Sequence, residues 1–171
     1  MDSDSLTVMA ELAIALAGFA SLVAIIGQRR SRDSPAVEAT RLRAMLETSL
    51  LTGAACVIPL VAAKTSMPLA AVWRGSSAAL MVAMALLLAH HLRLRRSSPD
   101  RSYQSPRWWL VTAACLQFSA MLVLGLNTVG LVPWTEAAYL IAPAALLIYA
   151  GLLFLQIVVS FLSATPGEPT A

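Results

Sequence analysis

Residues 137–162 read AAYLIAPAALLIYAGLLFLQIVVSFL and contain no charged side chain. A helix needs about 20 apolar residues to cross the hydrocarbon core of a bilayer, because each residue advances about 1.5 Å. A run of this length and composition therefore predicts a membrane-spanning helix. A proline such as Pro143 is tolerated inside such a helix.

Four further apolar blocks precede this run. Of the 171 residues, 58% are hydrophobic and 12% are charged, whereas soluble domains average about 45–50% and about 25%. The five predicted spans cover residues 6–27, 44–63, 72–92, 108–127 and 137–162. The sequence thus predicts an all-α integral membrane protein, with a single transmembrane domain over residues 1–162. The last residues, 163–171, include two prolines and a glycine, and we expect a disordered tail.

The basic residues predict which way these helices are threaded. One set of alternate loops carries ten arginines, and the other carries only Lys64 and Arg74. The ten are Arg29, Arg30, Arg32, Arg41, Arg43, Arg93, Arg95, Arg96, Arg101 and Arg107. Because Arg and Lys accumulate in cytoplasmic loops, we expect a periplasmic N-terminus and a cytoplasmic C-terminus. The first residues are acidic, so we do not expect a cleaved signal peptide.

Composition also indicates the kind of membrane in which the protein is expected. The excess of Arg over Lys and the richness in Ala and Leu are typical of GC-rich bacterial genomes. Residues 11–19, followed by an arginine-rich loop, resemble small multi-pass proteins of proteobacterial inner membranes, and the resemblance implies no activity. We therefore expect a multi-pass protein of the bacterial inner (plasma) membrane, with membrane lipids as partners. Because the arginines flank apolar blocks, as topology signals do, we expect no nucleic-acid binding.

Tryptophans and prolines mark particular points of the predicted spans. The tryptophans at the predicted ends are Trp73, Trp108, Trp109 and Trp134. Indole rings gather at headgroup level, so we expect all four at the membrane surfaces. Pro59 and Pro143 lie inside spans, and each leaves one carbonyl without its helical donor, at Ala55 and Tyr139 respectively.

Small residues form a seam along the first predicted helix. Its members recur every three or four residues: Ala10, Ala13, Ala17, Ala20, Ala24 and Gly27. Small side chains let helix backbones approach closely within a membrane. The seam predicts a close helix–helix contact, either inside one chain or between copies of it.

A carboxylate, Glu11, lies in the same helix, about one turn after its predicted start. A charged group inside a span normally faces protein or water and has a partner. Our preferred partner is Arg74, which would join the first helix to the third. Exposure at the membrane surface and a role in proton or ion conduction are the alternatives.

A second group of charged residues is predicted at the opposite membrane surface. Arg43 precedes Glu47 by four residues, so the two share a helix face and can form an ion pair. His90 and His91 end the third span at a similar depth. Adjacent helical residues point about 100° apart, so we do not expect the histidines to bind one metal ion or a haem. The alternatives are a solvated, charge-balanced helix entrance and a cytoplasmic polar site.

The sequence lacks several common catalytic and cofactor-binding motifs. It contains no phosphate-binding loop, no HExxH, no GxSxG and no dinucleotide fingerprint. We therefore expect neither enzymatic activity nor a cofactor. The leading hypothesis is a structural or accessory subunit that forms a homo-oligomer, or joins a larger membrane complex, through the small-residue seam. An oligomeric ion channel or proton-coupled transporter using Glu11 and Glu47 is the alternative.

Overall fold

The computed structural model describes residues 3–30, 35–97 and 107–163, and these residues form only α-helices and their connections. The helices are α1 (Ser3–Arg30), α2 (Pro35–Ala62), α3 (Leu69–Ser97), α4 (Arg107–Val129) and α5 (Thr135–Ser163). Each is long and apolar enough to cross a membrane. The predicted all-α architecture with five such helices is confirmed. The predicted tail beyond Ser163 lies outside the described residues.

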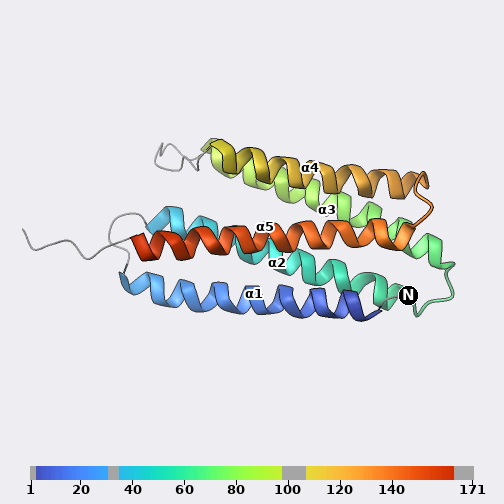
Figure 1. The fold of residues 1–171 in the computed structure, drawn as a ribbon, viewed down its shortest axis with the longest axis horizontal. Coiled ribbons are helices and arrows are strands. Elements are labelled where there is room, and N and C mark those ends of the chain that lie inside the picture. The colour runs from blue at the N-terminus through green and yellow to red at the C-terminus, as the bar shows by residue number, and fades with distance from the viewer. Residues whose placement is uncertain (1–2, 31–34, 98–106, 164–171) are drawn as a thin grey trace, which may run out of the picture.

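The five helices run up and down in one bundle (Figure 1). Helices that follow one another in the chain pack together, and α1 returns to contact α5. α5 packs against all four other helices, so it is the centre of the bundle. This position agrees with its composition, because a helix that is apolar on every side suits a buried place.

Because successive helices run in opposite directions, their connections lie at two ends of the bundle. The start of α1 and the loops 63–68 and 130–134 lie at one end, which we call the Lys64 end (Figure 1). The other end is formed by the end of α1, the start of α2, the end of α3, the start of α4 and the end of α5. Most arginines of the sequence flank these termini, and we call this the arginine-rich end.

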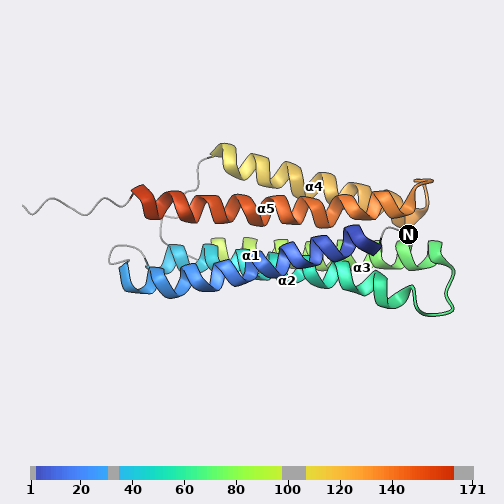
Figure 2. The ribbon, with the colours of Figure 1, turned by 60° about the horizontal axis from the view of Figure 1, so that its bottom comes forward.

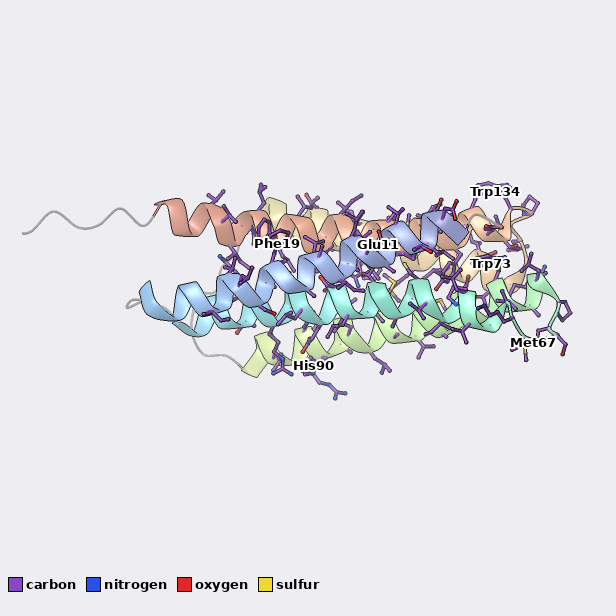
Figure 3. The ribbon with its side chains drawn as sticks, turned by 90° about the horizontal axis from the view of Figure 1, so that it is seen from below. Glu11, Phe19, Met67, Trp73, His90 and Trp134 are labelled. Carbon is purple, nitrogen blue, oxygen red and sulfur yellow. The ribbon has the colours of Figure 1, made fainter. Side chains whose placement is uncertain are left out.

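Large apolar side chains cover the outside of the bundle (Figure 3). One residue from each helix illustrates this, since each is more than 60% exposed: Ile14, Leu50, Leu86, Leu122 and Leu155. A soluble monomer rarely exposes a large contiguous apolar surface. Apolar surface on every helix, together with helices of this length, indicates a multi-pass membrane protein.

A hydroxyl group from α5 satisfies the carbonyl that Pro59 leaves without a helical donor. The Tyr139 hydroxyl donates to the Ala55 carbonyl oxygen at 2.6 Å, inside the bundle. The ring of Trp73 packs against the ring of Tyr139, and the two ring centroids are 5.5 Å apart. This joins α2, α3 and α5 near the Lys64 end.

Trp73 lies near the start of α3, at the Lys64 end, but its side chain is only 1% exposed and belongs to the core of the bundle. The indole faces α5, where Tyr139 provides a ring to pack against. Trp134, by contrast, is 61% exposed at the Lys64 end, as expected (Figure 3). The side chains of Trp108 and Trp109 lie outside the described part of the structure.

α4 ends in a glycine-dependent cap. Gly130 has φ of 82°, and its N–H bonds the Asn127 carbonyl at 3.1 Å, while Leu131 N–H bonds the Leu126 carbonyl at 3.0 Å. This pair of bonds is a Schellman motif, which satisfies the last carbonyls of a helix. The guanidinium of Arg74 lies directly over Gly130, where a Cβ would be 2.7 Å from Nη2. The positive φ favours glycine here, whereas the contact could be relieved by a movement of the Arg74 side chain.

Candidate functional site: a charged cluster and its cavity

Four charged or titratable side chains of α2 and α3 meet at the arginine-rich end. Arg43 Nε donates to Glu47 Oε1 at 2.7 Å, and His91 Nε2 lies 3.0 Å from Glu47 Oε2. Arg43 Nη2 lies 3.4 Å from His90 Nε2. We call these four residues the charged cluster. Each carboxylate oxygen of Glu47 thus has its own partner, one from its own helix and one from α3.

Helix geometry explains why all four residues reach one place. Arg43 and Glu47 are four residues apart and therefore lie on the same face of α2. His90 and His91 point in different directions from α3, and their ring centroids are 6.0 Å apart. One ring approaches Arg43 and the other approaches Glu47. The expected intrahelical pair is present, and the structure brings it together with both histidines.

The burial of the charged cluster limits its contribution to stability. The side chain of Arg43 is 59% exposed and that of Glu47 is 27% exposed. Exposed ion pairs contribute about 0–1 kcal/mol, because solvent screens them and two flexible side chains are fixed. The ion pairs of the charged cluster therefore add little to the free energy of folding, and their main effect is to hold the four side chains in position.

A cavity of about 260 Å³ lies beside the charged cluster. Four helices line it, and each contributes one polar side chain. Its lining residues are Thr48 from α2, Leu87, Leu88, His91 and Leu92 from α3, Ala113, Ala114, Gln117 and Phe118 from α4, and Tyr149 from α5. His91 belongs to both the charged cluster and the cavity, so it links the two.

The structure does not bring Glu11 and Arg74 together, so the expected pair is wrong for the described part of the chain. α1 packs mainly on α2 and α5 rather than on α3. The Arg74 guanidinium lies over Gly130, and Glu11 is exposed on the side of α1 away from the bundle. Because α1 begins at Ser3, Glu11 lies about 12 Å along the helix rather than one turn.

The small-residue seam of α1 packs inside the chain. Ala10, Ala13 and Ala20 are buried, and Ala17 is partly buried. Ala20 packs in a cluster with Leu42 and Met45 of α2 and with Leu153 and Ile157 of α5. The side chains of Ala24 and Gly27 lie outside the described part of the structure. The seam was predicted to make a helix contact either inside one chain or between copies, and the structure shows the contact inside one chain.

A second polar contact was not expected from the sequence. The buried Asn127 of α4 uses Nδ2 to donate to the Ser77 hydroxyl oxygen at 2.8 Å and to the Thr135 carbonyl at 2.9 Å. The Ser77 hydroxyl in turn donates to the Trp73 carbonyl at 2.8 Å. An asparagine in an otherwise apolar block was the available signal, because a polar group in such a block needs partners from other helices.

No group of three or more His, Cys, Asp or Glu side chains is placed to hold a metal ion within residues 3–30, 35–97 and 107–163. Comparisons with protein-family models, with curated proteins and with solved structures find no match for this chain. The features that bear on function are therefore the charged cluster, the cavity and the exposed face of α1.

Proposed function

We propose that this protein is a non-enzymatic structural or accessory subunit of the bacterial inner membrane, and that it forms a homo-oligomer. The observation that carries the proposal is Glu11, a carboxylate without a partner among the described residues, on a helix face that no other helix of the chain covers. The contact between copies uses this face instead of the seam, because Ala10, Ala13 and Ala20 of the seam are already buried within the chain.

The depth of Glu11 makes a partner necessary. Glu11 lies well inside the candidate span Asp4–Val23, with seven residues before it and twelve after it. A charged side chain near the middle of a span costs about 2.5–3.5 kcal/mol on insertion scales. A contact that hydrogen-bonds or neutralises the carboxyl group removes much of this cost. The monomer supplies no such contact in its described part, and a second copy of the chain can supply it.

Small residues beside Glu11 permit a close approach from outside. Ala15 and Gly18 are exposed on the same side of α1, and we call these two residues and Glu11 the outer face of α1. A Cβ added to Gly18 would meet no atom within 4 Å, so packing within the chain does not require a glycine there. Glycine in a helix costs about 0.5–1 kcal/mol relative to alanine. A helix of another molecule, packed closely on Gly18, would explain its presence.

A second copy of the chain fits this face. In a two-fold arrangement the outer face of α1 meets itself, and Glu11 of each copy reaches the other. Two carboxyl groups at short distance share a proton, because two negative charges repel strongly in a medium of low dielectric constant. The shared proton makes a hydrogen bond across the interface, which stabilises the pair within lipid.

The test measures oligomeric state in lipid nanodiscs by native mass spectrometry. We expect a dimer for the unchanged protein, a monomer for Glu11→Leu, and a dimer for Glu11→Gln, because an amide still forms hydrogen bonds across the interface. Gly18→Leu, which prevents close approach, should also give a monomer. Ala85→Leu on the exposed side of α3 is the control and should remain dimeric. A monomeric unchanged protein, or a dimer that survives both Glu11→Leu and Gly18→Leu, would overturn the proposal.

The proposed orientation places the arginine-rich end in the cytoplasm and the Lys64 end in the periplasm. It rests on the bias of ten basic residues against two. The bundle supports it, because α1 to α5 alternate in direction and the flanking arginines therefore fall at one end (Figure 1).

The alternative is an oligomeric channel or proton-coupled transporter that uses Glu11 and Glu47. In one chain Glu47 is turned toward His91 of α3, whereas Glu11 points away from the bundle. A continuous path through both carboxylates would therefore require more than one copy. Proton flux in liposomes that disappears with Glu11→Gln, while the dimer is retained, would favour this alternative over a purely structural role.

A further inference from the structure

The cavity beside the charged cluster lies where α4 diverges from its neighbours. α4 approaches α5 closely near the Lys64 end, and the distance between them grows toward the arginine-rich end (Figures 1 and 2). The cavity of about 260 Å³ has walls from α2, α3, α4 and α5 at this wider end. Phe118, one of its lining residues, is 61% exposed on the outside of the bundle. A molecule dissolved in lipid can therefore reach the cavity from the side.

The polar side chains of the cavity have hydrogen-bonding capacity left. His91 donates Nε2–H to Glu47, which fixes the ring and leaves Nδ1 to accept a hydrogen bond from another partner. The Thr48 hydroxyl donates to the Ala44 carbonyl at 2.7 Å, and its oxygen can still accept a hydrogen bond.

Gln117 has the strongest need for a partner. Its amide makes no hydrogen bond to another residue in the part of the chain that the structure describes. It lies in the candidate span Val111–Val129, where lipid supplies neither donor nor acceptor. An amide in such a place is costly unless it is paired, so Gln117 favours a ligand with a hydrogen-bonding oxygen.

The size and the walls of the cavity restrict the rest of the ligand. A cavity of about 150 Å³ binds benzene, so 260 Å³ accommodates a ring with several substituents. Phe118 and Tyr149 provide aromatic surfaces, and the remaining walls are leucine and alanine. Arg43 and Glu47 neutralise each other beside the cavity, and no Asp, Glu, Lys or Arg is among the residues that line it. These features favour an uncharged aromatic ring.

We infer that this cavity binds a neutral, lipid-soluble aromatic molecule that carries carbonyl or hydroxyl oxygens, the chemistry of a quinone or phenol head group. Gln117 donates an amide N–H to a carbonyl oxygen, His91 Nδ1 accepts from a hydroxyl group, and Phe118 and Tyr149 pack on the ring. Glu47 acts as a positioning residue, because it holds the His91 ring through Nε2. The inference is independent of the proposed oligomer, since every lining residue comes from α2 to α5 within one chain.

The experiment titrates the protein in nanodiscs with tetramethyl-1,4-benzoquinone and follows binding by isothermal titration calorimetry. Tetramethylbenzene, which has the same ring and methyl groups without oxygens, is the matched ligand control. We expect saturable binding of the quinone with one site per chain. The hydrocarbon should bind at least threefold more weakly, because it forms no hydrogen bond. Equal binding of the two compounds, or no saturable binding of the quinone, would overturn the inference.

Variants locate the site. Gln117→Leu keeps the approximate size of the side chain and should weaken quinone binding about three- to tenfold, with little change for tetramethylbenzene. Ala113→Phe fills the cavity and should abolish binding of both compounds. Ala85→Phe, an exposed position of α3 that does not line the cavity, should leave binding unchanged. Unchanged quinone affinity in Gln117→Leu and Ala113→Phe would place the bound molecule elsewhere and overturn the inference.

Discussion

At the scale of single residues, a proline leaves one backbone carbonyl without a donor, and a side chain of another helix supplies that donor. Pro59 has no N–H, so the Ala55 carbonyl loses its helical partner within an apolar bundle. The Tyr139 hydroxyl supplies the missing donor at 2.6 Å. Water is absent from the hydrocarbon region, so the carbonyl depends on this side chain. One hydroxyl group thereby links the proline-containing part of α2 to α5.

Tyr139→Phe should lower the free energy of unfolding by about 1–2 kcal/mol, because it leaves the buried Ala55 carbonyl without a donor and changes nothing else in shape. The measurement is equilibrium unfolding of the purified protein in mixed micelles by SDS titration. Ser21→Ala is the matched control, since it removes an exposed hydroxyl that bonds only its own helix at 3.0 Å. Its effect should be below about 0.5 kcal/mol. Equal effects of the two variants would show that the Tyr139 bond does not contribute.

At the scale of elements, α1 has two faces with different roles. The seam is buried against α2 and α5, whereas the outer face of α1 carries Glu11 and is exposed. Small residues occur on both faces, and for that reason the sequence alone leaves open which face contacts which partner. We therefore expect substitutions in the seam to change the free energy of unfolding, and substitutions on the outer face of α1 to change the oligomeric state.

Ala20→Leu should lower the free energy of unfolding by about 1–3 kcal/mol through overpacking. Ala20 is 0% exposed and packs among large side chains of α2 and α5, so three extra carbon atoms have no space. Ala54→Leu, at an exposed position of α2, is the matched control and should change stability by less than about 0.5 kcal/mol. Unfolding by SDS titration measures both. An Ala20→Leu protein that unfolds like the Ala54→Leu control would contradict the internal packing of the seam.

The elements were largely predictable from the sequence, and the contacts between them were not. Length and apolar composition locate all five helices, because lipid imposes one simple requirement on each span. The pair of Arg43 and Glu47 follows from their spacing along one helix. The pairing of Glu11 with Arg74 failed because it assumed that α1 and α3 are neighbours, which no local pattern determines. The burial of Trp73 depends in the same way on the position of Tyr139 in α5.

At the scale of the whole molecule, charge distinguishes two ends of an otherwise apolar bundle. Lys64 is exposed at one end, and the charged cluster lies toward the other. The cavity adjoins the charged cluster, so under the proposed orientation its ligand would bind in the cytoplasmic half of the membrane. The threading of the chain therefore decides from which side of the membrane the cluster is reached.

Cysteine accessibility in intact bacterial cells tests this threading. Cys56 and Cys115 are free thiols, so both are first replaced by alanine. Ser66→Cys, in the exposed loop between α2 and α3, should react with a membrane-impermeant maleimide added to intact cells. Asp33→Cys, in the arginine-rich segment, should react only after the inner membrane is permeabilised, because arginine-rich loops remain in the cytoplasm. The reverse labelling pattern would invert the bundle and place the charged cluster on the periplasmic side, whereas the packing of the helices and the cavity between them would be unchanged.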